Sequence, residues 1–171
     1  MRSPRSDKQF NHPGLFVVKA QELPLSGQAL LELMRAVLAR GRPFRFCARG
    51  WSMAPFIRDG DVITVAPLQQ ALPRVGEVVA FVRPEEGNLV VHRVVARKAA
   101  AVLIQGDNGL EYEDGLIPQE NLLGRVTQIE RDGHLVRLGL GLERYVIAWL
   151  SRTRLLVPVQ VRLASWLKRF S

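Results

Sequence analysis

The chain has 171 residues, 47% of them hydrophobic, and carries a formal net charge of +8 at pH 7. The hydrophobic share excludes a wholly disordered chain, and the length is most simply explained by one domain with an ordinary core, with or without an appended element. The single cysteine, Cys47, excludes an intrachain disulfide, and with three scattered histidines it offers no zinc-ligand spacing, so no metal or cofactor is expected.

Residues 1–42 are predicted to form a polar tail followed by an amphipathic helix. Within the tail, residues 15–19 would form a short edge strand. Ser26 is a suitable N-cap, apolar residues recur at helical spacing from Leu30 to Leu38, and Gly41 is placed to end the helix. No stretch contains the about 20 mostly apolar residues that cross a bilayer, and the N-terminus lacks the apolar region of a secretory signal peptide. No transmembrane anchor is therefore expected.

Residues 43–138 follow a different pattern, in which short strands alternate with turns. The last two predicted strands flank Arg131-Asp132-Gly133, which is typical of a hairpin turn. Six or seven such strands predict a mainly β domain, built as a barrel or a coiled sheet. The predicted strands are residues 44–48, 61–66, 76–83, 88–96, 101–105, 123–130 and 134–138.

Residues 139–171 are predicted to form a basic, amphipathic helical tail. From Arg137 onward there are seven basic residues and one acidic residue, interleaved with aliphatic and aromatic side chains, and Pro158 would kink the segment or divide it into two helices. Such helices suit an anchor lying at an anionic membrane surface, although a helix pair packed on the domain explains them equally well. Nucleic acid is not expected, because the basic residues form no polar stripe. The predicted apolar face consists of Leu155, Leu156, Val159, Leu163, Trp166, Leu167 and Phe170.

Ser52 lies in a segment that predicts a tight turn between two elements. Gly50 frees the backbone before it, and Pro55 stiffens the backbone after it. A turn of this kind can hold a serine hydroxyl clear of the surface, with backbone N–H groups nearby to stabilise an oxyanion. A nucleophilic serine also needs a base within hydrogen-bond reach, and the base needs an acceptor that orients it.

His92 is the candidate base. Alternation along a strand would place it on one face with Val90 and Val94, and a histidine among valines is more often structural than catalytic. Gly106-Asp107-Asn108 is, taken alone, most simply a turn. Histidine nevertheless suits the role of base, because its unperturbed pKa of about 6.5 lets it accept a proton near neutral pH. The combination of Ser52, His92 and the Gly106-Asp107-Asn108 segment, rather than any one of them, indicates catalysis.

The order of the motifs resembles that of the signal peptidase I-like serine peptidases, within the S24/S26 peptidase superfamily. The resemblance covers roughly residues 44–130. Bacterial members use lysine as the base, whereas His92 is similar to the endoplasmic-reticulum and archaeal branch, which pairs serine with histidine and aspartate. The matching segments are Ser52-Met53-Ala54-Pro55, Gly60-Asp61, Gly76-Glu77-Val78-Val79, His92-Arg93, Gly106-Asp107-Asn108, Asp114 and Gly124-Arg125-Val126.

The resemblance implies a role for each matching residue. Ser52 would be the nucleophile and His92 the general base, and Asp114 aligns best with the aspartate that orients the base. Asp107 would be a second, supporting acidic residue. The backbone N–H of Ser52 would meet the oxyanion.

Three further residues would shape the turn or the substrate cleft. Met53 and Pro55 would line the cleft, although simple packing is an equally good explanation for both. Gly50 stands where some bacterial relatives carry a serine, so that side-chain donor is missing here.

The resemblance implies a serine endopeptidase that removes a leader or signal segment from a precursor through an acyl-enzyme. Its substrate would be an extended peptide with small side chains near the cut, paired with a sheet edge. Family members usually carry a transmembrane anchor, and none is expected here, so the protein is expected in the cytoplasm, where its C-terminal helices could hold it on the inner membrane face. The alternatives are a repressor-type self-cleaving protease and a catalytically silent relative that binds peptides or membranes.

Overall fold

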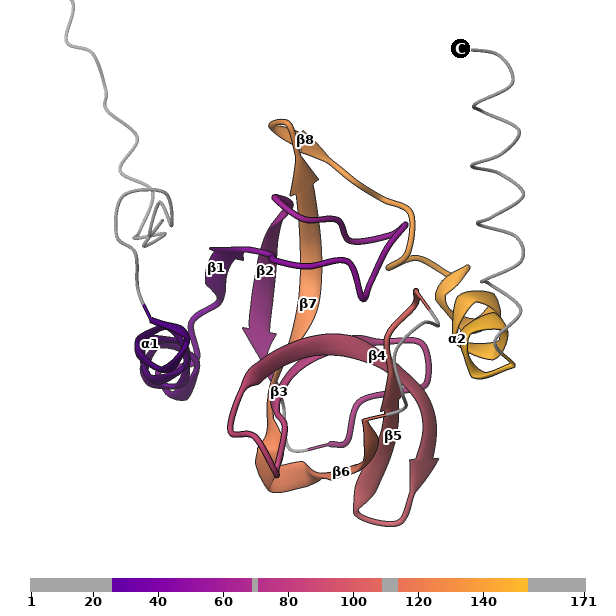
Figure 1. The fold of residues 1–171 in the computed structure, drawn as a ribbon, viewed down its shortest axis with the longest axis horizontal. Helices are drawn as coiled ribbons and strands as arrows, with labels where there is room; N and C mark the ends of the chain where they lie inside the picture. Colours follow the sequence, from indigo (N-terminus) through magenta and orange to yellow (C-terminus); the bar gives the residue numbers. More distant parts are fainter. Residues whose placement is uncertain (1–25, 69–70, 109–113, 154–171) are drawn as a thin grey trace, which may run out of the picture.

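The computed structural model describes residues 26–68, 71–108 and 114–153 (Figure 1). In these residues eight antiparallel strands form one sheet and two α-helices flank it, which confirms the predicted mainly β fold. The elements are α1 (Gly27–Ala39), β1 (Phe44–Cys47), β2 (Val62–Pro67), β3 (Val78–Val82), β4 (Leu89–Lys98), β5 (Ala101–Gln105), β6 (Gly115–Pro118), a 3-10 helix (Gln119–Asn121), β7 (Leu122–Arg131), β8 (His134–Leu135) and α2 (Arg144–Arg152).

The sheet is open and coiled, not a closed barrel. Its strand order is β1-β2-β7-β3-β4-β5-β6, with β8 added to β7, and within the described residues β1 and β6 do not pair with each other. All seven predicted strands of residues 43–138 are present, with ends that differ by a few residues. The sequence pattern does not predict β6, because a four-residue strand bounded by glycine and proline has no alternation to recognise. The predicted strand at residues 15–19 and the predicted helical face from Leu155 to Phe170, with its break at Pro158, lie outside the described residues.

Helix α1 begins and ends where its sequence predicts. The Ser26 hydroxyl accepts a hydrogen bond from the Ala29 N–H at 3.2 Å, and Gly41 follows the helix with a φ of +70°. The helix buries Leu31, Met34 and Leu38 and lies beside β1 (Figure 1). Its packing completes the core cluster formed by Met34, Leu38, Phe44, Phe46, Met53, Ile57, Ile63, Val65, Val78, Ala80, Val126 and Ile129.

Strand β3 is buried on both faces, which explains its uninterrupted apolar sequence. Val78 and Ala80 belong to the core under α1, whereas Val79 and Phe81 belong to a second cluster, on the other face. That cluster consists of Val79, Phe81, Val94, Val102, Ile104, Ile117 and Leu122. Because β4 pairs with β3 in the middle of the sheet, the side chains of its central residues are also buried, whichever face they occupy.

Gly124, the glycine of the Gly-x-Val motif, lies where three strands come together. On β7 it pairs with Pro67 of β2 on one side and Ala80 of β3 on the other. A Cβ at this position would lie 2.5 Å from Cγ1 of Val65 and 2.6 Å from the Ala66 carbonyl oxygen. The motif therefore reflects close strand packing rather than chemistry.

Helix α2 packs beside β4, on the opposite side of the domain from α1 (Figure 1). It buries Ile147, Ala148 and Ser151, whereas Val146 and Trp149 are about 60% exposed. Among the described residues, no helix combines the length and the hydropathy that crossing a membrane requires.

Candidate active site

Ser52 is held by the loop that connects β1 to β2. The base of this loop is closed by two backbone hydrogen bonds, from Ala48 to Asp61 at 2.7 Å and from Gly60 to Ala48 at 2.9 Å. Near its tip, Gly50 has a φ of +95° and donates its N–H to the Asp59 carboxylate at 2.9 Å. This conformation suits glycine and explains why the residue stands two before the serine.

The residues after Ser52 fasten the loop to the core. Met53 and Ile57 are only 4% exposed and belong to the cluster under α1. The Ile57 N–H donates to the Met53 carbonyl oxygen at 3.0 Å, which forms one tight turn. Ser52 itself is only partly buried. The anchored Met53 thus fixes the backbone while the neighbouring serine stays accessible.

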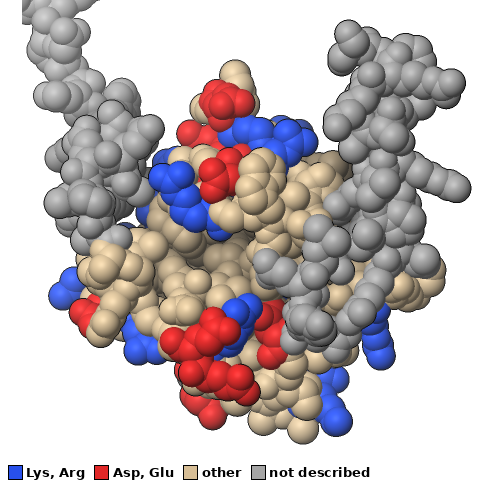
Figure 2. Space-filling model, viewed as in Figure 1, with Lys and Arg blue, Asp and Glu red and all other residues tan. Residues whose placement is uncertain are grey.

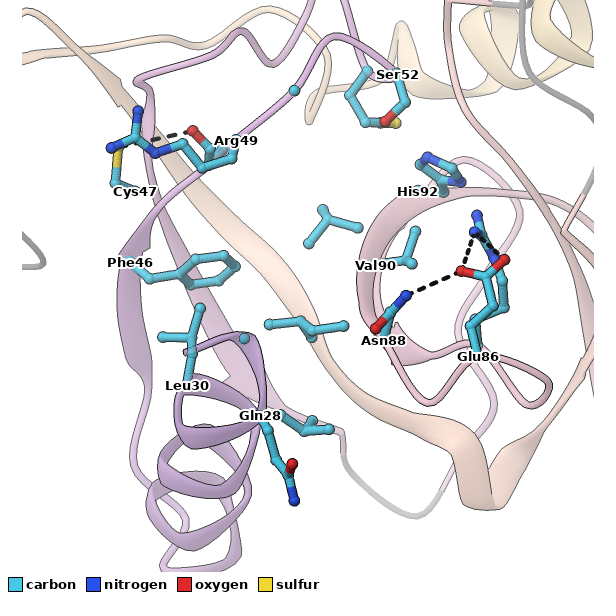
Figure 3. Close-up of a pocket in the computed structure, with 18 of the residues that line it drawn as sticks. Gln28, Leu30, Phe46, Cys47, Arg49, Ser52, Glu86, Asn88, Val90 and His92 are labelled. Atoms are coloured by element: carbon cyan, nitrogen blue, oxygen red, sulfur yellow. Dashed lines mark hydrogen bonds and ion pairs between the residues drawn. The ribbon is translucent and has the colours of Figure 1, made fainter. Parts of the chain in front are cut away.

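His92 reaches toward Ser52 from the middle of β4. Its side chain is 2% exposed, and Nδ1 is hydrogen-bonded to Oδ2 of Asp114. The other ring nitrogen, Nε2, lies toward Gly106, where an added Cβ would be 3.2 Å from Nε2 and 3.4 Å from Cβ of Ser52. Both groups therefore border the same small space, and Figure 3 draws Ser52 and His92 at the same end of the cleft.

Asp114 immediately precedes β6, and its side chain is 1% exposed. Its Oδ1 accepts hydrogen bonds from Arg83, from Nη2 at 2.6 Å and from Nε at 3.1 Å. Burial raises the pKa of Asp114, but the hydrogen bond with His92 and then the Arg83 guanidinium outweigh this effect and hold the pKa below its ordinary value of 3.8. The group is thus an ionised acceptor, which assigns the proton to Nδ1 of His92 and makes Nε2 the nitrogen able to accept one.

Asp107 pairs with Arg93, the residue after His92 on β4. The two side chains are fully buried, and the Arg93 guanidinium donates Nε at 2.8 Å to one carboxylate oxygen and Nη2 at 2.7 Å to the other. Nη1 of Arg93 donates to the carbonyl oxygens of Gly76 and Gly139, both at 2.8 Å. The hydroxyl of Ser151, on α2, donates to Asp107 at 3.0 Å. Nearly every polar atom of this buried ion pair is therefore satisfied.

The Gly106-Asp107-Asn108 turn connects this ion pair to Ser52. The Asn108 N–H donates to the Ser52 carbonyl oxygen at 2.8 Å. A Cβ on Gly106 would lie 2.8 Å from that same oxygen, so a larger residue would push the two segments apart. The turn thereby fixes the backbone of Ser52 relative to His92, because its own aspartate is bound to the neighbour of His92 on β4.

The sequence pattern singles out most of these residues but not Arg83 or Ser151, which hold the two aspartates. The signal for such partners is weak, because each is one polar residue in an unremarkable setting. Arg93 gives a clearer signal, since an arginine that shares one face of a central strand with Val91 and Val95 needs a buried carboxylate. Among the described residues, no group of three or more histidine, cysteine or acidic side chains could hold a metal ion.

A cleft of about 800 Å³ extends from Ser52 and His92 toward α1. Figure 2 shows the surface hollowed here, with a floor made mostly of uncharged residues. Gly50 and Met53 line the cleft, whereas Pro55 lies in the turn after Ser52 and is exposed.

We expect the protein to lose stability in acid through Asp61 and Asp114. Burial raises the pKa of Asp61, but hydrogen bonds from Arg131 and from the Arg58 N–H outweigh it, so the pKa lies below its ordinary value of 3.8. Both carboxyl groups have a lowered pKa in the folded protein. Their contribution to stability is therefore complete above pH 3.8 and is lost as the pH falls through the folded-state pKa values. Thermal unfolding followed by circular dichroism should give a melting temperature that falls steeply below about pH 4.

The matched variants for this experiment are Asp61→Asn and Glu120→Gln. Asp61→Asn should be less stable at neutral pH but should lose less further stability on acidification, because one of the two carboxylates is gone. Glu120 is exposed, so its variant should follow the wild-type curve. An unchanged acid dependence in Asp61→Asn would contradict the assignment.

Comparison with protein families gives one match. The family described as Peptidase S24-like matches residues 14–127, a span that covers more than half of the chain and includes Ser52, His92, Asp107 and Asp114. None of the curated proteins matches the chain. Gly139 and Ser151, which complete the buried ion pair, lie outside the matched span.

Proposed function

Since the chain belongs to the Peptidase S24-like family, we propose that it is a serine endopeptidase in which Ser52, His92 and Asp114 act together on a precursor peptide. One observation carries this proposal. The ionised Asp114 holds Nδ1 of His92, and Nε2 borders the same space as Ser52 at one end of an open cleft. A serine, a histidine and an acid arranged in this order form the constellation that activates a serine nucleophile.

In the proposed reaction, Oγ of Ser52 transfers its proton to Nε2 of His92 and attacks the scissile carbonyl carbon. The Ser52 N–H donates to the resulting oxyanion. His92 then gives the proton to the leaving nitrogen as the C–N bond breaks, which leaves an ester on Ser52. Water, deprotonated by His92, hydrolyses the ester and restores the serine. Asp114 stabilises the positive charge that His92 carries in between.

The substrate that suits this cleft is an extended peptide. The cleft is bordered by β1, which among the described strands pairs with β2 alone, and by residues 89–91 of β4, which precede the pairing with β5 that begins at Arg93. A strand edge whose N–H and C=O groups are open to solvent binds an extended segment through main-chain hydrogen bonds. By analogy with signal peptidases, we propose small side chains next to the cut and a leader or signal segment as the product removed.

We also propose that α2 lies against an anionic membrane surface. Its outer face and the loop before it expose apolar side chains, and Arg144 and Arg152 lie on the same helix. The chain as a whole is strongly basic, which complements acidic lipids. The exposed apolar residues are Leu138, Leu142, Tyr145, Val146 and Trp149.

The test is cleavage of a diverse peptide pool, read by mass spectrometry, with and without phosphatidylglycerol vesicles. We expect the wild type to cut after small residues, and Ser52→Ala to make no cuts. Thr127→Ala should cleave the pool like the wild type, because it removes only a hydroxyl on β7 that donates to the Thr64 carbonyl oxygen at 3.3 Å. A rate that rises with phosphatidylglycerol but not with phosphatidylcholine would support the membrane contact.

Other outcomes would favour the alternatives. Ser52-dependent cleavage of the chain itself, without cleavage of the pool, would favour a repressor-type self-cleaving protease. Cuts that persist in Ser52→Ala would rule out Ser52 as the nucleophile. If neither the pool nor the chain is cut and native-host function survives Ser52→Ala, the peptidase proposal fails and a binding module is the better explanation.

A further inference from the structure

We propose that the end of the cleft remote from Ser52 is a subsite for one large apolar side chain of the substrate, roughly three to five residues from the cleaved bond. This inference rests on the proposed peptidase function, which names neither this subsite nor its ligand. It assigns a role in substrate selection to helix α1.

The walls of this end come from three separate elements. Figure 3 shows Ser52 and His92 at one end of the cleft and Leu30, on α1, at the other, with Phe46 of β1 along one side and Val90 of β4 along the opposite side. Leu30 and Leu89 are both partly buried and line the cleft, so each packs on the core and still presents apolar surface to it. An apolar side chain placed between them would be removed from water, which is favourable.

The length of β4 sets the distance between the proposed subsite and the cleaved bond. From His92 to Leu89 the strand advances by three residues, or about 10 Å at the usual rise of a strand. A peptide paired with this edge advances at the same rate, so the residue that reaches Leu89 and Leu30 lies about three residues or more from the bond at Ser52. Only alternate side chains of an extended peptide face the same way, which leaves one or two positions for the subsite.

The size and rim of the cleft agree with a large apolar ligand. A volume of about 800 Å³ is far larger than small residues beside the cut can fill. Charged side chains, Glu32 and Arg35 of α1 and Glu86 of the β3–β4 turn, are exposed and line the cleft at this end. The apolar surface therefore lies below a polar rim, an arrangement that admits an apolar side chain and keeps the main chain solvated at the edge.

The test compares Leu30→Ser with Leu33→Ser. Both leucines lie on α1 and are partly buried against the same core, but only Leu30 lines the cleft. In the peptide pool we expect the wild type to prefer leucine, isoleucine or phenylalanine over serine, at one position in this range, by roughly tenfold. Leu30→Ser should abolish the preference without changing the residues selected next to the cut, and Leu33→Ser should keep it. If the melting temperature of Leu30→Ser is well below that of Leu33→Ser, the milder variant Leu30→Ala replaces Leu30→Ser in this comparison.

An unchanged preference in the Leu30 variants, or an equal loss in Leu33→Ser, would overturn the subsite. If the wild type cuts no peptide in the pool, the subsite is tested with 1-anilinonaphthalene-8-sulfonate as an apolar probe. Leu30→Ser should then weaken binding of the probe several-fold relative to wild type and Leu33→Ser. Equal binding by all three proteins would overturn the subsite independently of catalysis.

Discussion

If the proposed function holds, replacing Asp114 by asparagine should lower kcat for peptide cleavage by roughly 10⁴-fold while the protein stays folded, as the same replacement of the orienting acid does in a Ser-His-Asp protease. The carboxylate is the acceptor that keeps the proton on Nδ1 of His92. An amide can donate to Nδ1 instead, which favours the tautomer with its proton on Nε2, facing Ser52. The amide also lacks the negative charge that stabilises a protonated His92.

The matched control for Asp114→Asn is Glu86→Gln. Both carboxylates accept hydrogen bonds from Arg83, and Asp114 is in addition hydrogen-bonded to His92. Because Glu86 lies on the rim of the cleft, Glu86→Gln can change KM, but it should keep kcat within a few-fold of wild type. The measurement is steady-state cleavage of the best peptide from the pool, with circular dichroism to verify folding. Comparable losses in both variants would assign the effect to Arg83 rather than to orientation of His92.

Replacing Arg93 by methionine should destabilise the protein by about 3–5 kcal/mol, because it leaves the Asp107 carboxylate buried without its cation. Urea unfolding followed by tryptophan fluorescence measures the change in the free energy of unfolding. The double variant Arg93→Met with Asp107→Leu removes both charges and should recover most of the loss, since a buried ion pair is often replaced by apolar residues at little net cost.

The same pair of variants separates stability from catalysis. The turn that carries Asp107 also donates from Asn108 to the Ser52 carbonyl oxygen. The double variant should therefore be stable but slow, because the turn is no longer tied to β4 beside His92. A double variant as unstable as Arg93→Met would contradict the proposed cause of the instability. Full activity in the double variant would show that the ion pair does not position Ser52.

Much of the fold follows from local patterns. The apolar spacing from Leu30 to Leu38, with Ser26 before it and Gly41 after it, determines α1, because capping and periodicity act within a few residues. Alternation and β-branched runs likewise locate the strands of residues 43–138. Local patterns do not predict β6, because its pairing with β5, rather than its own four residues, makes it a strand.

In the candidate site, too, some features follow from the local sequence and others only from tertiary contacts. Residue types and their order along the chain are enough to point to Ser52, His92, Asp107 and Asp114. The family resemblance aligns Asp114 with the orienting acid, but the contact between Asp114 and His92 is itself a feature of the tertiary structure. Adjacent residues of β4 point to opposite faces, so His92 and Arg93 each take a different acid, and only the path of β5 and β6 determines which acid reaches which face.

Local sequence is therefore sufficient to predict most of the elements, the mainly β class and the residues able to carry the chemistry, because these depend on neighbours close along the chain. Three features depend instead on tertiary contacts: Asp114 is hydrogen-bonded to His92, Arg83 and Ser151 are hydrogen-bonded to the two acids, and α1 lines the far end of the cleft. These contacts join residues about 20 to 60 positions apart, and their formation depends on how the sheet coils rather than on any local preference.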